Sequence, residues 1–123
     1  MPAWTSAELA AFGSAEEVRV AARRGDGDLT TPVVVWVVRC GDRLFARSVK
    51  GADGAWFRAT RERHGGRLEG GGIERDVTFV DADHAVDDDV DAAYGAKYGA
   101  DNPDVHAINA PGARSTTMEL RPG

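Results

Sequence analysis

The residues best suited to chemistry lie in one short segment between Arg47 and Arg58. Its arginine and lysine side chains can bind an oxyanion through charge-assisted hydrogen bonds, and a serine hydroxyl adds a further donor. An aromatic pair, Trp56 and Phe57, offers a face that can stack on a flat ring. The segment therefore predicts a site for a small anionic ligand with a ring system, formed by Arg47, Ser48, Lys50, Trp56 and Arg58.

These residues also have a purely structural interpretation. Arg47 and Ser48 alternate across one predicted strand, so both reach the same ligand only if the chain bends there. Otherwise the strand end is exposed, and its basic side chains form ion pairs with Asp42 or Asp53. For Trp36 we expect a place in the core, because large aromatic side chains fill small barrels.

No other group of residues has the spacing of a known site. The three histidines are scattered, and the acidic stretch 81–89 lacks the glycine and the final glutamate of a calcium-binding loop. The acids from Asp87 to Asp91 are explained by the start of a helix. Cys40 is interpreted as a thiol at a strand end. We therefore expect no metal, and no catalytic residue can be named.

Composition indicates one domain over residues 1–123, long enough to bury a single core. The formal net charge of −5 argues against nucleic-acid binding, which needs a positive surface. The longest apolar run, Pro32 to Val38, is far too short to cross a membrane. One cysteine and no charged-then-apolar leader predict a cytoplasmic location.

Hydrophobic periodicity predicts the elements that position the segment. Thr5 and Glu8 have the spacing of a capping box, which predicts a short helix stapled by Trp4 and ended by Gly13. Further helical turns are expected over 56–63 and a longer helix over 87–98, whereas residues 102–112 read as a loop. Strands are expected at 18–22, 33–38, 44–49, 67–69, 77–80 and 115–120, with a turn at 25–28.

Strands dominate and follow one another in hairpin order. Fifteen glycines suit an architecture rich in turns. The sequence therefore predicts a mostly β (α+β) fold, a small six-stranded antiparallel barrel with peripheral helices.

A series of motifs follows in a fixed order along the chain: Trp4, Arg23–Gly27, Pro32–Val38, Arg47-Ser48, Gly54–Arg58, Gly70-Gly71, Asp76-Val77 and Tyr94–Gly99. This order resembles a bacterial family known as domain of unknown function 2255, and the likeness covers nearly the whole sequence. That family in turn resembles the split-barrel flavin-binding superfamily, which includes pyridoxamine-phosphate oxidases and deazaflavin-dependent reductases.

The resemblance implies a split β-barrel oxidoreductase that binds flavin mononucleotide (FMN) or a deazaflavin. In the reductases a strand ends in a Ser-Lys-Gly-like loop, and a Trp-Tyr type pair follows. Here Ser48–Gly51 and Trp56-Phe57 occupy those places. Arg47, Lys50 and Arg58 would hold the phosphate, and Trp56 would flank the ring. Because split barrels often pair around a shared cleft, a homodimer is also implied.

A second hypothesis is a non-catalytic small-ligand-binding or interaction module that kept the barrel and lost the cofactor. The hairpin Arg23–Asp28 carries two acids that oppose an anion, where the reductases have a Gly- and Ser/Thr-rich hairpin. Arg58 also stands where the reductases usually have Asn. An open cleft lined by Arg47, Lys50 and Trp56 would favour the enzyme, and a plugged cleft would favour the module.

Overall fold

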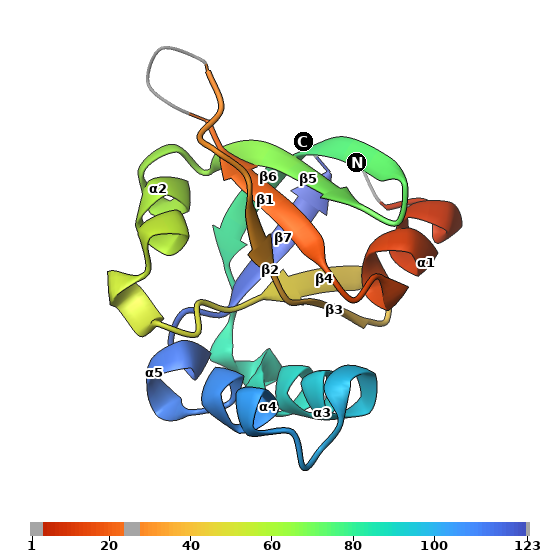
Figure 1. Cartoon of the computed structure of the whole chain (residues 1–123), viewed down its shortest axis with the longest axis vertical. Coiled ribbons are helices and arrows are strands. Elements are labelled where there is room, and N and C mark those ends of the chain that lie inside the picture. The colour runs from red at the N-terminus through yellow and green to blue at the C-terminus, as the bar shows by residue number, and fades with distance from the viewer. Residues whose placement is uncertain (1–3, 24–27, 123) are drawn as a thin grey trace.

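The computed structural model describes residues 4–23 and 28–122 (Figure 1), so the expected turn at 25–28 lies mostly outside the described residues. Seven antiparallel strands form one sheet in the order β2-β1-β5-β6-β7-β4-β3. Its two edge strands are consecutive in the chain, and the sheet curls into a nearly closed barrel. The predicted antiparallel barrel is confirmed, but the predicted number of six strands is wrong. The strands are β1 (Val18–Ala22), β2 (Val33–Val35), β3 (Val37–Cys40), β4 (Arg43–Ala46), β5 (Gly65–Gly70), β6 (Ile73–Asp81) and β7 (Met118–Pro122).

The additional strand arises from a break at Trp36. The apolar run predicted as one strand divides there, because β2 pairs with β1 whereas β3 pairs with β4. Val35 and Val37, on either side of the break, both point into the main core. No ladder links β2 to β3 in the described chain. We call this unpaired junction at Trp36 the seam.

In the described part of the chain five α-helices surround the barrel, with α1 and α2 on opposite sides and α3, α4 and α5 in a layer beneath β3 and β4 (Figure 1). The predicted capping box is present, since Thr5 Oγ1 accepts from the Glu8 N–H and Glu8 Oε1 accepts from the Thr5 N–H. No helix in the described part of the chain is long and apolar enough to cross a membrane. The helices are α1 (Ser6–Ser14), α2 (Ala55–Arg63), α3 (Asp87–Tyr98), α4 (Pro103–Ile108) and α5 (Pro111–Arg114), with 3-10 turns η1 (Gly51–Asp53) and η2 (His84–Val86).

The expected loop over 102–112 is wrong, because it contains α4 and α5. Each of these helices begins with a proline, Pro103 or Pro111, at a position where the missing N–H costs nothing. Asn102 caps α4 by accepting a hydrogen bond from the Asp104 N–H. The two prolines therefore start helices instead of breaking them, and α4 brings residues to the pocket described below.

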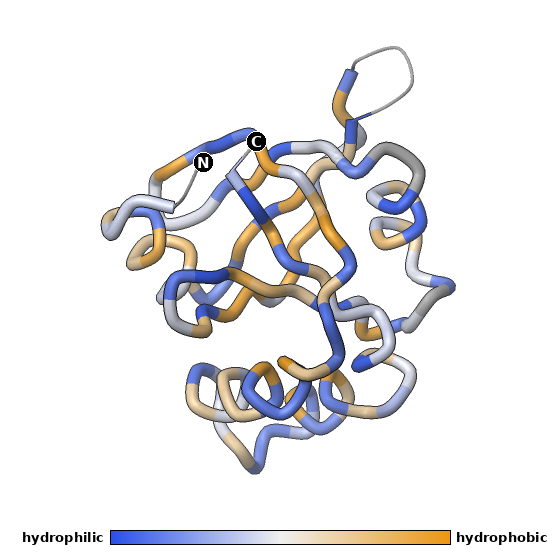
Figure 2. The backbone as a smooth tube through the Cα atoms, turned by 180° about the vertical axis from the view of Figure 1, so that it is seen from behind, coloured by the Kyte–Doolittle hydropathy of each residue, from blue (hydrophilic) through white to orange (hydrophobic). Residues whose placement is uncertain are grey.

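Two cores hold the layers together. The main core fills the barrel, and Trp4 joins it by donating from Nε1 to Leu120 O across 2.9 Å. The most hydrophobic stretches of backbone accordingly run along the barrel strands (Figure 2). The second core lies between the outer face of β3 and β4 and the helical layer, and comprises Val38, Phe45, Val90, Tyr94, Val105 and Ile108. Successive residues of β3 and β4 therefore face different cores, which fixes the helical layer against the seam.

Candidate functional site

A pocket of about 280 Å³ opens at the seam. Its walls come from β2, the segment after β4, the first turn of α2, and α4. Six of the lining side chains are aliphatic or aromatic, and the other two belong to Arg47 and Asp104. We call this cavity the seam pocket. It is lined by Val34, Val35, Trp36, Arg47, Val49, Trp56, Asp104 and Ile108.

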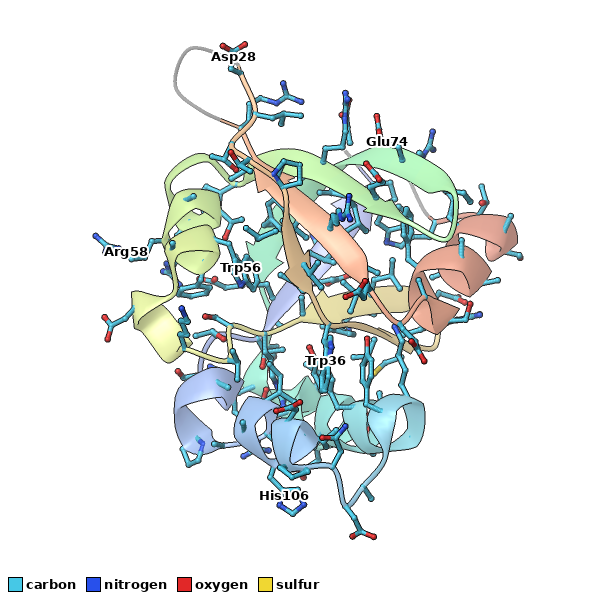
Figure 3. All side chains as sticks on the ribbon, viewed as in Figure 1. Asp28, Trp36, Trp56, Arg58, Glu74 and His106 are labelled. Atoms are coloured by element: carbon cyan, nitrogen blue, oxygen red, sulfur yellow. The ribbon has the colours of Figure 1, made fainter. Side chains whose placement is uncertain are left out.

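Two tryptophans from different elements line the pocket. Trp36 points from the seam toward the helical layer, and Trp56 lies between α2 and the sheet (Figure 3). One face of Trp36 is covered by Tyr98, with ring centroids 3.9 Å apart and an interplanar angle of 7°. Neither indole N–H donates a hydrogen bond to a described residue. Trp36, expected in the core, packs against the second core and is half-buried. Trp56 is half-buried against the main core, so each indole keeps an exposed part.

Arg47 also reaches the pocket, but its charged group is bound by the protein. Nε donates to Thr117 Oγ1 at 2.8 Å. Nη1 donates to Asp91 Oδ1 at 2.5 Å and to Asn109 Oδ1 at 2.9 Å, and Nη2 donates to the Asp87 carbonyl at 3.1 Å. Only 1% of the residue is exposed. The interpretation of Arg47 as an exposed strand end paired with nearby acids is therefore wrong, and its donors are already occupied.

The Arg47 network joins the barrel to the helical layer. β4 ends at Ala46, so Arg47 leaves the sheet and turns toward α3. Asp87 and Asp91 lie four residues apart on one face of α3, where both can approach the same guanidinium. Asp87 also accepts from Thr117 Oγ1 and contacts His84 Nδ1 at 2.9 Å. The acidic residues at the start of α3 thus also bind the Arg47 guanidinium.

The remaining predicted residues, Ser48, Lys50 and Arg58, are not among those that line the pocket. Ser48 is buried, and its backbone N–H donates to Thr116 Oγ1. Lys50 is exposed and forms no described ion pair. Arg58 points away from the barrel on the outer face of α2 (Figure 3), over a separate shallow hollow. The structure thus brings Arg47 and Trp56 to one pocket, keeps Ser48 and Lys50 on the adjoining loop, and separates Arg58 from them.

The model of a bacterial family described as "Uncharacterized protein conserved in bacteria", domain of unknown function 2255, matches residues 8–120. The chain belongs to this family. No curated protein matches the sequence. The seam pocket and the Arg47 network both lie within the matched residues, so they belong to the family region of the chain.

Sequence reasoning about this family member missed the residues that α4 contributes to the pocket. Asp104 and Ile108 were expected in a loop, and nothing assigned them a role. The pattern Asn102-Pro103-Asp104, a capping residue followed by proline and an acid, is a helix start and could have placed them on one helix. In the described residues, no cluster of three or more His, Cys, Asp or Glu could hold a metal ion.

A lysine links three elements near the seam. Lys97 Nζ, on α3, donates to Val37 O at 2.5 Å and reaches Phe12 O at 3.5 Å. Loss of hydration on burial lowers the pKa of this amine to about 8. Burial likewise raises the pKa of Tyr98, whose ring lies 5.0 Å from Nζ. The amine therefore binds α1 and β3 to the helical layer in the charged form at neutral pH.

Proposed function

We propose that this protein is a non-catalytic module that binds a small ligand with a flat, mostly apolar ring system in the seam pocket. The observation that carries the proposal is the pair Trp36 and Trp56, which line one cavity and whose indole N–H groups have no acceptor among the described residues. Stacking of aromatic rings contributes about 0.5–1.5 kcal/mol beyond the area that it buries. The two free donors can add orientation by binding an acceptor on the ring.

The size of the pocket limits the ligand. Sites for drug-sized ligands have volumes of about 300–1,000 Å³, and the seam pocket has about 280 Å³. It therefore suits one ring system, with any further group of the ligand lying outside the cavity. The apolar lining from Val34, Val35, Val49 and Ile108 suits the body of such a ring.

A flavin- or deazaflavin-dependent oxidoreductase is the second candidate. It is supported because Arg47 and Trp56, two residues expected at the cofactor, line the same pocket. The ring of such a cofactor fits the lining, whereas neither arginine expected at its phosphate is placed to hold it, since Arg47 is occupied and Arg58 lies apart. A bound flavin supplies the hydride chemistry itself. The chain would then only bind and orient the ring through Trp36 and Trp56.

Ring binding is tested by titrating the full chain with riboflavin and with a 5-deazaflavin while following tryptophan fluorescence. We expect saturable quenching that Trp56→Leu weakens about tenfold, because the variant loses a stacking face. Arg58→Ala, on the outer face of α2, is the matched control and should bind normally. The proposal fails if neither compound gives saturable quenching up to high micromolar concentration, with free N-acetyltryptophanamide correcting for light absorption.

The two candidates differ in turnover. If the protein accelerates oxidation of a reduced nicotinamide by FMN above the rate with free FMN, the oxidoreductase is favoured. Binding of FMN without acceleration favours the module.

The proposal includes a homodimer in the cytoplasm. Support for the dimer comes from exposed apolar side chains beside the seam pocket, on the edge strand β2 and the loop after β4, namely Val33, Val34 and Val49. The single cysteine supports a reducing compartment. Light scattering that gives the 13.1 kDa monomer mass at working concentration would contradict the dimer.

A further inference from the structure

The Ser48 hydroxyl is buried without a partner. The residue is 1% exposed, yet its Oγ forms no hydrogen bond with any described residue. A Cβ placed on Gly54 would lie 2.2 Å from this Oγ, so the hydroxyl faces the residue that precedes α2. No fully enclosed side-chain nitrogen or oxygen in the described part of the chain lacks a partner, so Oγ retains a narrow access. A buried hydroxyl of this kind calls for an acceptor or donor from outside.

The helix end that Ser48 faces is also open. α2 has 9 residues, and its N-cap, Gly54, supplies no side-chain hydrogen bond. The first amide bonded within the helix is that of Arg58, which donates to Gly54 O at 3.0 Å. The N–H groups of Ala55, Trp56 and Phe57 have no acceptor among the described residues. Three free amides and the positive end of a helix dipole together favour an oxyanion.

The charges near this helix end partly offset one another. Lys50 lies two residues after Ser48, is exposed, and forms no ion pair with a described residue. Asp53, directly before the N-cap, is an exposed carboxylate that opposes an anion. Arg47 adds no net charge, since Asp87 and Asp91 neutralise it. The amides and the hydroxyl therefore supply the binding, and Lys50 compensates for Asp53.

We propose that Ser48 Oγ and the first-turn amides of α2 form an oxyanion site beside the seam pocket, so that the ligand carries a carboxylate or phosphate on its ring system. The two sites are joined through Trp56, whose amide belongs to the helix end while its indole lines the pocket. Val49, the neighbour of Ser48, lines the pocket as well. The statement about the ring rests on the proposed function, whereas the oxyanion site stands on its own geometry.

The oxyanion site is tested with inorganic phosphate and with acetate, followed by amide chemical shifts in the full chain. We expect saturable shifts at Ala55, Trp56 and Phe57 with at least one of the anions. Ser48→Ala should weaken binding about tenfold, because it removes one hydrogen bond to a charged group. Asp53→Asn should strengthen binding. Ser48→Ala should also fold normally, since Oγ has no partner to lose.

The exposed serine on α1, Ser6→Ala, is the control and should leave anion affinity unchanged. Absence of saturable shifts at the three amides with both anions would overturn the site. Equal anion affinity in Ser48→Ala and the unaltered chain would also overturn it.

A matched pair of probes separates this inference from ring binding. FMN and riboflavin share one ring system, and only FMN carries a phosphate. We expect FMN to bind at least tenfold more tightly, and Ser48→Ala to abolish the difference. Equal affinities would overturn the anionic ligand while leaving ring binding intact. Amide shifts with phosphate but no binding of either flavin would support the oxyanion site and contradict flavin-ring binding.

Discussion

Arg47 Nη1 donates to Asp91 Oδ1 across 2.5 Å, and this contact ties the end of β4 to α3. The guanidinium lies in the wall of the seam pocket while its hydrogen-bonding groups point into the protein. Its removal deprives Asp87, which is buried, of its arginine partner. Breaking such a pair costs much more than the pair itself contributes to stability, because one charge stays behind without compensation.

Arg47→Met should therefore lower the free energy of unfolding by about 3–5 kcal/mol. Urea unfolding followed by circular dichroism measures the change. Arg58→Met alters an exposed arginine without a described ion pair and should change stability by less than about 0.5 kcal/mol. If Arg47→Met stays within about 1 kcal/mol of the unaltered chain, the network does not hold the layers together.

The capping box of α1 makes the free energy of unfolding depend on pH in the acidic range. The Thr5 N–H, and then Arg75, stabilise the charged Glu8 carboxylate and hold its pKa below the ordinary value of 4.5. A lowered folded-state pKa adds stability above the ordinary value, and this is lost as the pH falls through the folded value. Glu8→Gln should lower the free energy of unfolding by about 1 kcal/mol at pH 7. Between pH 5 and pH 3 this variant should lose less stability than the unaltered chain.

Unfolding free energies at about pH 7, 5 and 3 test this dependence. Glu17→Gln, an exposed change outside the helix, serves as the control. If the unaltered chain and Glu8→Gln lose the same free energy of unfolding on acidification, protonation of the Glu8 carboxylate does not affect stability.

Lys97 makes the free energy of unfolding depend on pH in the alkaline range, with the same sign as Glu8 in the acidic range. Its folded-state pKa of about 8 lies below the ordinary value of 10.5, so the unfolded chain binds more protons between these values. Stability from this group therefore rises with pH across that window. Between pH 7.5 and 9.5 we expect the free energy of unfolding of the unaltered chain to rise by about 1 kcal/mol relative to that of Lys97→Met. The expected change is kept small because the amine is half-exposed and solvent screens its charge.

Both chains should carry Cys40→Ser, because burial raises the pKa of the Cys40 thiol and its titration acts against that of the lysine. If the difference in unfolding free energy between the two chains stays constant over this range, Lys97 titrates alike in the folded and unfolded states.

A glycine inside the barrel should be irreplaceable. A Cβ at Gly66, on β5, would lie 2.1 Å from Ala21 O and 2.9 Å from Phe79 Cε2. Because the first contact is with backbone, β1 and β5 would have to move apart. Gly66→Ala should destabilise the protein by more than about 3 kcal/mol or prevent folding.

Gly112→Ala, where nothing lies within 4 Å of the new Cβ, should change the melting temperature little. A folded Gly66→Ala protein with unchanged melting temperature would mean that this pair of strands tolerates a wider spacing.

The elements that the sequence predicted well are those whose signals are local. Thr5 and Glu8 form a capping box within one turn, and the acids after Val86 make up the first turn of α3. The break at Trp36 has no such signal, because an apolar run looks the same whether it keeps one partner strand or exchanges it. The strand count was wrong for this reason.

The site was harder to predict because its partners are distant in sequence. Charge alone favours an exposed Arg47, and the groups that bury it come from residues 40 to 70 positions later. Trp56 was identified from its place next to the basic segment, and the structure puts it at the pocket. Arg58 was grouped with it by proximity in the chain, yet two positions along a helix point to different sides.

The junction at Trp36 leaves the barrel without a closing ladder. Because β2 and β3 do not pair with each other in the described chain, the barrel keeps two strand edges there. Helix α3 holds this opening through three contacts: the Tyr98 ring stacked on Trp36, the hydrogen bond from Tyr94 Oη to Trp36 O at 2.7 Å, and the one from Lys97 Nζ to Val37 O. One side of the opening is therefore closed by a helix and not by a partner strand.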